Sequence, residues 1–454
     1  MTARILPLAA GATFLAMLDA TVTNLAFPDL QRDFDGATIS GLTWIVTLYA
    51  VSFAALLAPA GRLADLLGRR RLYRAGIGVF TLASLACVLA PNLPALLAAR
   101  TVQGAGAAAM VPVSLAVLLH GTPPEKRARS IGLWSASAAL AAAVGPSVGG
   151  VLVDLLDWRA LFFINIPLGL ALFWTARGLA PEPGEGRLPD VLGTVLLGGG
   201  LGVLALAVSQ GPDLGWSDPR VLAALLGGAA AVALALTRSA RHPVPAMEIS
   251  LWRNRDFAVT NVVSFFYGAA FFPWMLVGVL VLTRMWGYSE LEAGLAMTPG
   301  AVSAAVASVL MGRLAAPRTA ILTGSLVMLG TAVWTWRALP EEPRFLAFWL
   351  PCGLLIGIGM GALATGTAGS AALSVAPVRF AGATGLNTTA RQLGGALGTA
   401  VLAALLSGPR AGAEEFTTVY AYCAIVCALA LLAGLGLRTA VPAVSTAARE
   451  GAPA

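Results

Sequence analysis

Three ionisable side chains stand inside long apolar stretches of this 454-residue chain: Asp19, Arg100 and Arg391. A carboxylate can take up and release a proton, whereas an arginine keeps its charge and pairs with an anion. An acid and an arginine at similar depth in an apolar layer would form a proton-binding pair in which Asp19 is the titrating member. The same pattern fits a static ion pair, so the sequence leaves both interpretations open.

The apolar runs that hold these residues have the length of transmembrane helices. The chain is 58% hydrophobic and 11% charged, and its apolar runs of about 20 residues alternate with short polar breaks. This pattern predicts an all-α integral membrane protein with no separate soluble domain. The first run lacks a signal-peptide cleavage site and is expected to be retained. Fourteen spans are expected, at 6–28, 41–61, 74–91, 94–119, 129–153, 158–178, 189–209, 219–237, 257–283, 291–312, 318–337, 345–373, 380–407 and 416–437.

Basic residues are unevenly divided between the two sides of such a bundle. With the N-terminus inside, twenty Lys and Arg residues fall on the cytoplasmic side and seven on the outer side. Cytoplasmic loops carry an excess of Lys and Arg, so we expect a multi-pass protein of the cell membrane with both termini in the cytoplasm. The same bias accounts for the net charge of +7 without a nucleic-acid partner.

Helix geometry puts Asp19 and Arg100 at a similar depth. At about 1.5 Å per residue, each lies roughly 20 Å from the inner surface of a layer about 30 Å thick. Gln103 lies one turn from Arg100, and Thr23 and Asn24 lie about one turn from Asp19. Asn24 and Gln103 would line a polar cavity, whereas a hydrogen bond to the neighbouring backbone is the better interpretation of Thr23.

Two further clusters are candidates for contact with a substrate. Asn387, Arg391 and Gln392 lie near the middle of one late helix, and no acid accompanies Arg391 in that helix. The run FFYGAAFFPWM contains Tyr267 and Trp274, whose rings suit lipophilic or cationic ligands. Core packing and lipid contact are the alternative for most rings of this run.

Two short sequences recur about 250 residues apart. GRLA at 61–64 returns at 312–315, and GL at 132–133 returns at 385–386. Together with the helix count, they predict two parallel six-helix halves with two inserted helices between them. The expected parts are an N-terminal half at 1–180, inserted helices 7 and 8 with a cytoplasmic linker at 181–255, a C-terminal half at 256–440 and a cytoplasmic tail at 441–454.

Several segments, in order along the chain, resemble signature motifs of one transporter superfamily. They are LDATVTNLAFPDL from Leu18, GRLADLLGRRRL from Gly61, RTVQGAGAA from Arg100, GPSVGG from Gly145, WRALFFINIPLG from Trp158 and NTTARQLGGALG from Asn387. With fourteen spans, the chain resembles the major facilitator superfamily and, within it, the drug:proton antiporters of the EmrB/QacA type. The resemblance covers nearly the whole chain. It implies efflux of lipophilic or cationic small molecules, such as drugs or antibiotics, by alternating access and proton exchange.

The second of these motifs is expected to act as a conformational switch. Its candidate residues are Gly61, Asp65, Gly68, Arg69 and Arg70, in the loop after the second helix. A carboxylate near a helix end can hold a neighbouring helix by a charge-assisted hydrogen bond, and breaking that bond would change the inward-closed state. Anchoring at the membrane surface is the alternative for the arginines.

The GPSVGG motif contains the other switch candidates, Gly145, Pro146, Gly149 and Gly150. Proline bends a helix and glycine permits close helix approach. Helix packing alone would explain these residue types. The resemblance implies that the bend seals the outer side during exchange.

These features together predict a transporter and not an enzyme. The sequence contains no Ser/His/Asp set, metal-ligand spacing or phosphate-binding loop, so we expect no metal or cofactor and the proton gradient as energy source. The expected partners are the lipid membrane, protons and a small-molecule substrate of a protein acting as a monomer. A dedicated exporter of one metabolite, a proton-coupled importer and a non-transporting receptor or scaffold are the alternatives.

Overall fold

All regular elements of the described residues are helices. The computed structural model describes residues 2–34, 39–180, 190–406 and 413–438. The α-helices are α1 Thr2–Val22, α2 Phe27–Asp33, α3 Ile39–Leu67, α4 Arg69–Val88, α5 Leu93–His120, α6 Arg127–Leu155, α7 Ala160–Phe163, α8 Asn165–Thr175, α9 Val191–Leu214, α10 Pro219–Ser239, α11 Arg255–Leu280, α12 Glu290–Leu314, α13 Pro317–Ala338, α14 Leu350–Leu373, α15 Phe380–Leu405 and α16 Ala413–Leu435.

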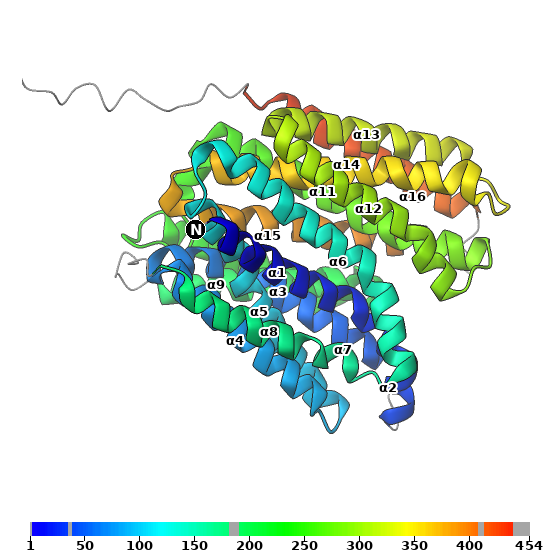
Figure 1. The fold of residues 1–454 in the computed structure, drawn as a ribbon, viewed down its shortest axis with the longest axis horizontal. Coiled ribbons are helices and arrows are strands. Elements are labelled where there is room, and N and C mark those ends of the chain that lie inside the picture. Colours follow the sequence, from blue (N-terminus) through cyan, green and yellow to red (C-terminus); the bar gives the residue numbers. More distant parts are fainter. Residues whose placement is uncertain (1, 35–38, 181–189, 407–412, 439–454) are drawn as a thin grey trace, which may run out of the picture.

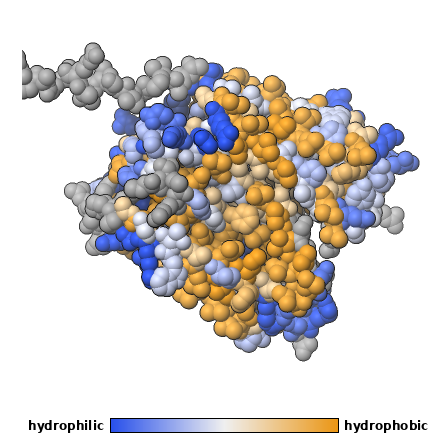
Figure 2. All heavy atoms as spheres, in the orientation of Figure 1, coloured by the Kyte–Doolittle hydropathy of each residue, from blue (hydrophilic) through white to orange (hydrophobic). Residues whose placement is uncertain are grey.

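The helices form a bundle with the proportions of a membrane protein. Thirteen helical spans of the described chain are long and apolar enough to cross a membrane. The remaining expected span, α15, is 26 residues long but carries the polar cluster around Arg391. Figure 2 shows a broad apolar band across the molecule with hydrophilic groups toward both ends. The predicted all-helical membrane fold is confirmed.

Two predicted boundaries were wrong for identifiable reasons. The first span ends at Val22 and not near residue 28, because the chain passes through a short 3₁₀ turn and begins α2. The expected loop after the second span is helical on both sides of Gly68, which has φ of 101°. Glycine adopts this conformation without strain, so one residue suffices to turn the chain from α3 into α4. Asp65 therefore lies in the last turn of α3 and not in a loop.

The helices fall into two groups that meet at one end of the bundle (Figure 1). We call the end at which α1 begins the proximal end and the opposite end the distal end. The first group contains α1 to α8, and the second contains α11 to α16. Between them, α9 and α10 pack together, and α9 also lies against α3 and α15.

The recurring glycines form two equivalent contacts between these groups. Gly61 of α3 lies against Gly385 of α15, where an added Cβ on Gly385 would be 3.3 Å from the Gly61 Cα. Gly312 of α12 lies against Gly132 of α6, where an added Cβ on Gly132 would be 3.0 Å from the Gly312 Cα. Gly61 corresponds to Gly312 in the repeat, and Gly132 corresponds to Gly385. Each contact therefore joins one copy of the first motif to the opposite copy of the second, as two-fold related halves require.

Candidate functional site

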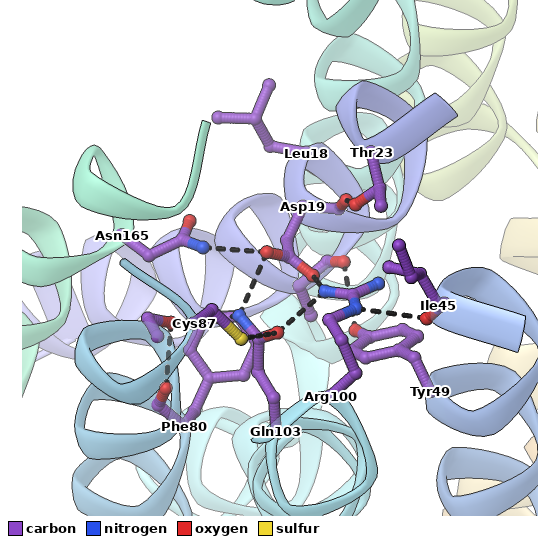
Figure 3. A network of polar contacts seen from close by, with 12 residues as sticks. Leu18, Asp19, Thr23, Ile45, Tyr49, Phe80, Cys87, Arg100, Gln103 and Asn165 are labelled. Atoms are coloured by element: carbon purple, nitrogen blue, oxygen red, sulfur yellow. Dashed lines mark hydrogen bonds and ion pairs between the residues drawn. The ribbon is translucent and has the colours of Figure 1, made fainter. Parts of the chain in front are cut away.

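Asp19 lies at the centre of a buried polar network between α1, α5 and α8 (Figure 3). Its Oδ2 accepts a hydrogen bond from Arg100 Nη1 at 2.6 Å. Its Oδ1 accepts from Gln103 Nε2 at 2.9 Å and from Asn165 Nδ2 at 2.7 Å. All four residues have an exposed fraction of 0%. The structure therefore brings the two predicted charges and Gln103 into one sealed cluster.

Arg100 is fixed by groups other than the carboxylate. Its Nε donates to the Ile45 carbonyl at 3.2 Å, and its Nη1 also donates to Gln103 Oε1 at 2.6 Å. The guanidinium carbon lies 4.3 Å from the centre of the Tyr49 ring and 5.5 Å from that of Phe162. Cation–π contacts of this kind stabilise a desolvated cation. The position of the arginine is thus set by α3 and α7 as well as by its own helix.

The carboxylate has one oxygen for each kind of partner. Oδ2 contacts the guanidinium and Oδ1 receives two neutral amide donors, so the ion pair is carried by Oδ2 alone. Helix α4 also positions Gln103, because Gln103 Nε2 donates to Ser84 Oγ at 2.8 Å.

Sequence reasoning missed Asn165, Tyr49 and Ser84. Asn165 is an isolated polar residue in the apolar stretch WRALFFINIPLG, the same signal that singled out Asp19. Tyr49 carried no such signal, because a tyrosine in an apolar helix is ordinarily a packing residue. Ser84 is buried and donates to the Phe80 carbonyl, as serines in helices commonly do.

The other predicted residues near this network lie in α6 and around the end of α1. Thr23 donates to the Asp19 carbonyl at 2.7 Å, the backbone contact expected of it. The Asn24 and Pro146 side chains lie outside the described part of the structure. Gly145 of α6 lies against Thr21 of α1, whereas an added Cβ at Gly150 would meet nothing within 4 Å.

The GPSVGG segment forms a continuous stretch of α6. Gly149 within it is buried. Gly145 brings α6 close to α1 of the same group of helices. In this conformation the motif contributes to packing within one half, and its role as an outer seal remains a prediction.

The predicted substrate cluster lies in the second group of helices, apart from the Asp19 network. Asn387 Nδ2 donates to Ser264 Oγ at 2.7 Å, and the Tyr267 hydroxyl donates to the Met360 carbonyl at 3.3 Å. Trp274 packs edge-on against Tyr420, with ring centres 4.7 Å apart. Trp274 is buried, so core packing is its observed role.

Arg391 and Gln392 differ from these neighbours. Both side chains are partly exposed. Neither has a hydrogen-bond or ion-pair partner among the described residues. Their polar groups therefore keep hydrogen-bonding capacity that the described residues do not use.

The predicted switch residues join the two groups of helices at the proximal end. Asp65 pairs with Arg69 at 3.2 Å and accepts from the Gly382 backbone N–H at 2.8 Å. Arg69 also donates to the Pro377 carbonyl. Gly382 and Pro377 belong to the second group of helices. The switch motif therefore links the two groups at the proximal end. Arg70 instead donates to the Arg177 carbonyl within its own group, at 2.8 Å.

A second ionic contact joins the groups at this end. Glu248, in the segment between α10 and α11, lies 2.9 Å from Arg379 and 3.8 Å from Arg62. Arg62 is in α3 and Arg379 directly precedes α15. We call these three residues the linker clamp. It contacts both groups, and Arg62 also donates to the Pro245 carbonyl at 3.3 Å.

The sequence matches the Major Facilitator Superfamily over residues 9–280. It is 34% identical to the multidrug resistance protein Stp of Mycobacterium tuberculosis over 410 residues, covering 87% of this chain and 74% of that protein. The chain belongs to the major facilitator superfamily. Another superfamily relative, the cephamycin export protein CmcT of Amycolatopsis lactamdurans, is 34% identical over 460 residues, covering 98% of this chain and 94% of that protein.

The fold agrees with that of a solved member of the superfamily. The human organic anion transporter MFSD10 (TETRAN) superposes with a TM-score of 0.67 at 15% identity, over 96% of this chain and 99% of that one. At this identity the likeness concerns the fold alone. As a major facilitator protein, the chain is a multi-pass membrane transporter of small molecules, and the predicted class of protein is confirmed.

Proposed function

We propose that the protein exports lipophilic small molecules, drugs or antibiotics among them, across the cell membrane in exchange for protons. Its relatives are named for multidrug resistance and for antibiotic export. The observation that carries the proton-coupled mechanism is the fully buried Asp19–Arg100 pair. Ionisable residues this deep in a membrane helix bundle are costly and commonly mark the path of an ion or a substrate. We expect the protein to act as a monomer that draws on the proton gradient alone.

In this mechanism Asp19 changes partners during the cycle. A proton arriving from the distal side neutralises the carboxylate and releases Arg100 from its ion pair. The neutral network then favours separation of the two groups at the proximal end, where the proton leaves and substrate enters. Restoration of the ion pair accompanies the return.

The proximal end is the cytoplasmic end in this proposal. The switch motif and most basic residues between helices lie there, as the positive-inside bias requires. Asp65, Arg69 and the linker clamp hold this end together, so the described conformation is closed toward the cytoplasm.

The test is proton movement in inverted membrane vesicles, with Asp19→Asn as the variant. Addition of an exported compound to energised vesicles should release protons from the lumen. Asp19→Asn should lower this response roughly tenfold or more, because it keeps the side-chain shape and removes the titration. Asp154→Asn is the matched control, since Asp154 is exposed at the distal end of α6. Full proton-coupled efflux by Asp19→Asn would falsify the proposal.

An exporter dedicated to one metabolite is the second candidate. It is favoured by the relative CmcT, which is named for export of a single class of compound. A drug-susceptibility panel in an efflux-deficient host separates the two. Protection against several unrelated compounds supports the broad exporter, and protection against one supports the dedicated exporter.

A further inference from the structure

Arg391 is a cation inside a membrane-spanning bundle, and no carboxylate among the described residues pairs with it. It lies in α15, eleven residues after Phe380, which is about 17 Å along the helix axis. Among the described residues no group accepts a hydrogen bond from its guanidinium. The side chain is partly exposed, so it is not sealed from other molecules.

The two arginines that are buried in the described structure are each paired with a carboxylate. Arg100 is paired with Asp19 at 2.6 Å, and Arg69 is paired with Asp65 at 3.2 Å. An unpaired charge at mid-depth is costly in a membrane protein and points to a ligand or an ion path. Arg391 therefore has the charge and the access that a bound anion would require.

The helix α11 packs closely against α15 beside Arg391. Gly268 of α11 lies directly against the Arg391 carbonyl, so the two helices are in close contact there. Tyr267 directly precedes Gly268 in α11 and therefore lies at the same level of the bundle as Arg391. Its ring lies 5.7 Å from that of Phe271. Gln392 adds an amide with no partner among the described residues. The site thus offers one cation, one neutral donor and aromatic surface.

We propose that Arg391 binds the carboxylate of an amphiphilic organic anion, whose apolar body lies against the aromatic side chains of α11. Guanidinium groups bind carboxylates through two parallel hydrogen bonds. A cationic substrate would meet an uncompensated like charge here. This inference rests on the proposed export function and names the class of substrate that the site selects.

The proposal fixes the charge carried in each cycle. With one proton entering, export of a monoanion moves two positive charges inward, export of a neutral molecule moves one, and export of a monocation moves none. An inside-negative membrane potential should therefore accelerate efflux of an organic anion more than efflux of its neutral analogue.

The first experiment measures binding to the purified full-length protein in detergent. The probes share one body: pyrenebutanoate, pyrenebutanol and a pyrenebutyl-trimethylammonium ion. Arg391→Gln should weaken binding of the carboxylate roughly tenfold. Binding of the alcohol should stay within about twofold. Arg391→Lys should restore part of the carboxylate affinity. Arg284→Gln, at an exposed arginine, is the matched control.

Three results would overturn the proposal. They are an equal loss of affinity for all three probes in Arg391→Gln, unchanged carboxylate binding in that variant, and a wild-type protein that prefers the ammonium probe. A thermal-unfolding measurement on each variant excludes a folding defect as the source of a selective loss.

The second experiment separates this proposal from the proposed function. Wild-type protein in proteoliposomes is tested with the carboxylate and the alcohol at a fixed pH gradient and at clamped membrane potentials. A steeper potential dependence for the carboxylate supports both proposals. Arg391-dependent binding without any proton-coupled flux would refute the export mechanism and leave the anion site standing. Proton-coupled flux of the alcohol alone would refute the anion site.

Discussion

At the scale of single residues, the charge of Asp19 is inseparable from that of Arg100. Removing one partner of a buried ion pair leaves an uncompensated charge, which typically destabilises a protein by about 3–5 kcal/mol. Arg100 has an exposed fraction of 0%, and its remaining partners are neutral. The loss of transport in Asp19→Asn must therefore be measured on protein shown to be folded.

This leads to a stability prediction. Asp19→Asn should lower the free energy of unfolding in detergent by about 3 kcal/mol. Adding Arg100→Gln to this variant should recover part of the loss, because both charges are then gone. Thermal unfolding of the two variants and of Asp154→Asn measures the difference. A double variant no more stable than Asp19→Asn would show that the pair is not coupled in this way.

The sequence was sufficient to pair Asp19 with Arg100, because depth along two antiparallel helices follows from residue counting alone. It was not sufficient to find Asn165 as a third partner. That contact depends on the short break between α7 and α8, and on the rotation of α8 toward α1. Rotation about a helix axis is set by packing and not by composition, so residue counting cannot supply it.

At the scale of helices, the four recurring glycines set how closely the two groups approach. An added Cβ at Gly132 would lie 2.5 Å from the Ser308 carbonyl oxygen. This is closer than van der Waals contact allows, and the neighbour is backbone that cannot rotate away. The residue pattern predicted the repeat. That Gly61 contacts Gly385 and Gly132 contacts Gly312 could be seen only in three dimensions.

Gly132→Ala should therefore hold the proximal end open. The native cysteines are buried, so a reporter thiol at Ala381→Cys can be labelled with a maleimide in intact inverted vesicles. Gly132→Ala should raise its labelling rate by roughly fivefold and lower transport, since α6 and α12 can no longer meet. Gly330→Ala in α13 is the matched control, since an added Cβ there would meet nothing within 4 Å. Equal labelling in the two variants would contradict the prediction.

At the scale of the whole molecule, the segment between α10 and α11 connects the two groups as well as separating them in sequence. Its Glu248 contacts Arg62 and Arg379, and all three side chains keep some exposure to solvent. Partly exposed ion pairs contribute modestly and are weakened by salt. The division of the chain at 181–255 remains a prediction, and the linker clamp gives that segment a function of its own.

Glu248→Gln should loosen the proximal closure without abolishing it. We expect maleimide labelling of the Ala381→Cys reporter to rise roughly twofold at low salt, with the difference from wild type shrinking at high salt. Glu125→Gln is the control, because Glu125 is an exposed acid at the same end. If salt leaves the labelling rate of the parent unchanged and Glu248→Gln behaves like the control, the clamp makes no contribution.

The complete burial of Asp19 also bears on what the protein does when no substrate is present. A carboxylate with an exposed fraction of 0% has no contact with solvent on either side in this conformation. Proton exchange then requires helix movement, so an idle molecule is not a passive conductor of protons. A cell could hold many copies in its membrane without dissipating the gradient that drives them. Proteoliposomes containing the substrate-free protein should accordingly lose an imposed pH gradient no faster than protein-free vesicles.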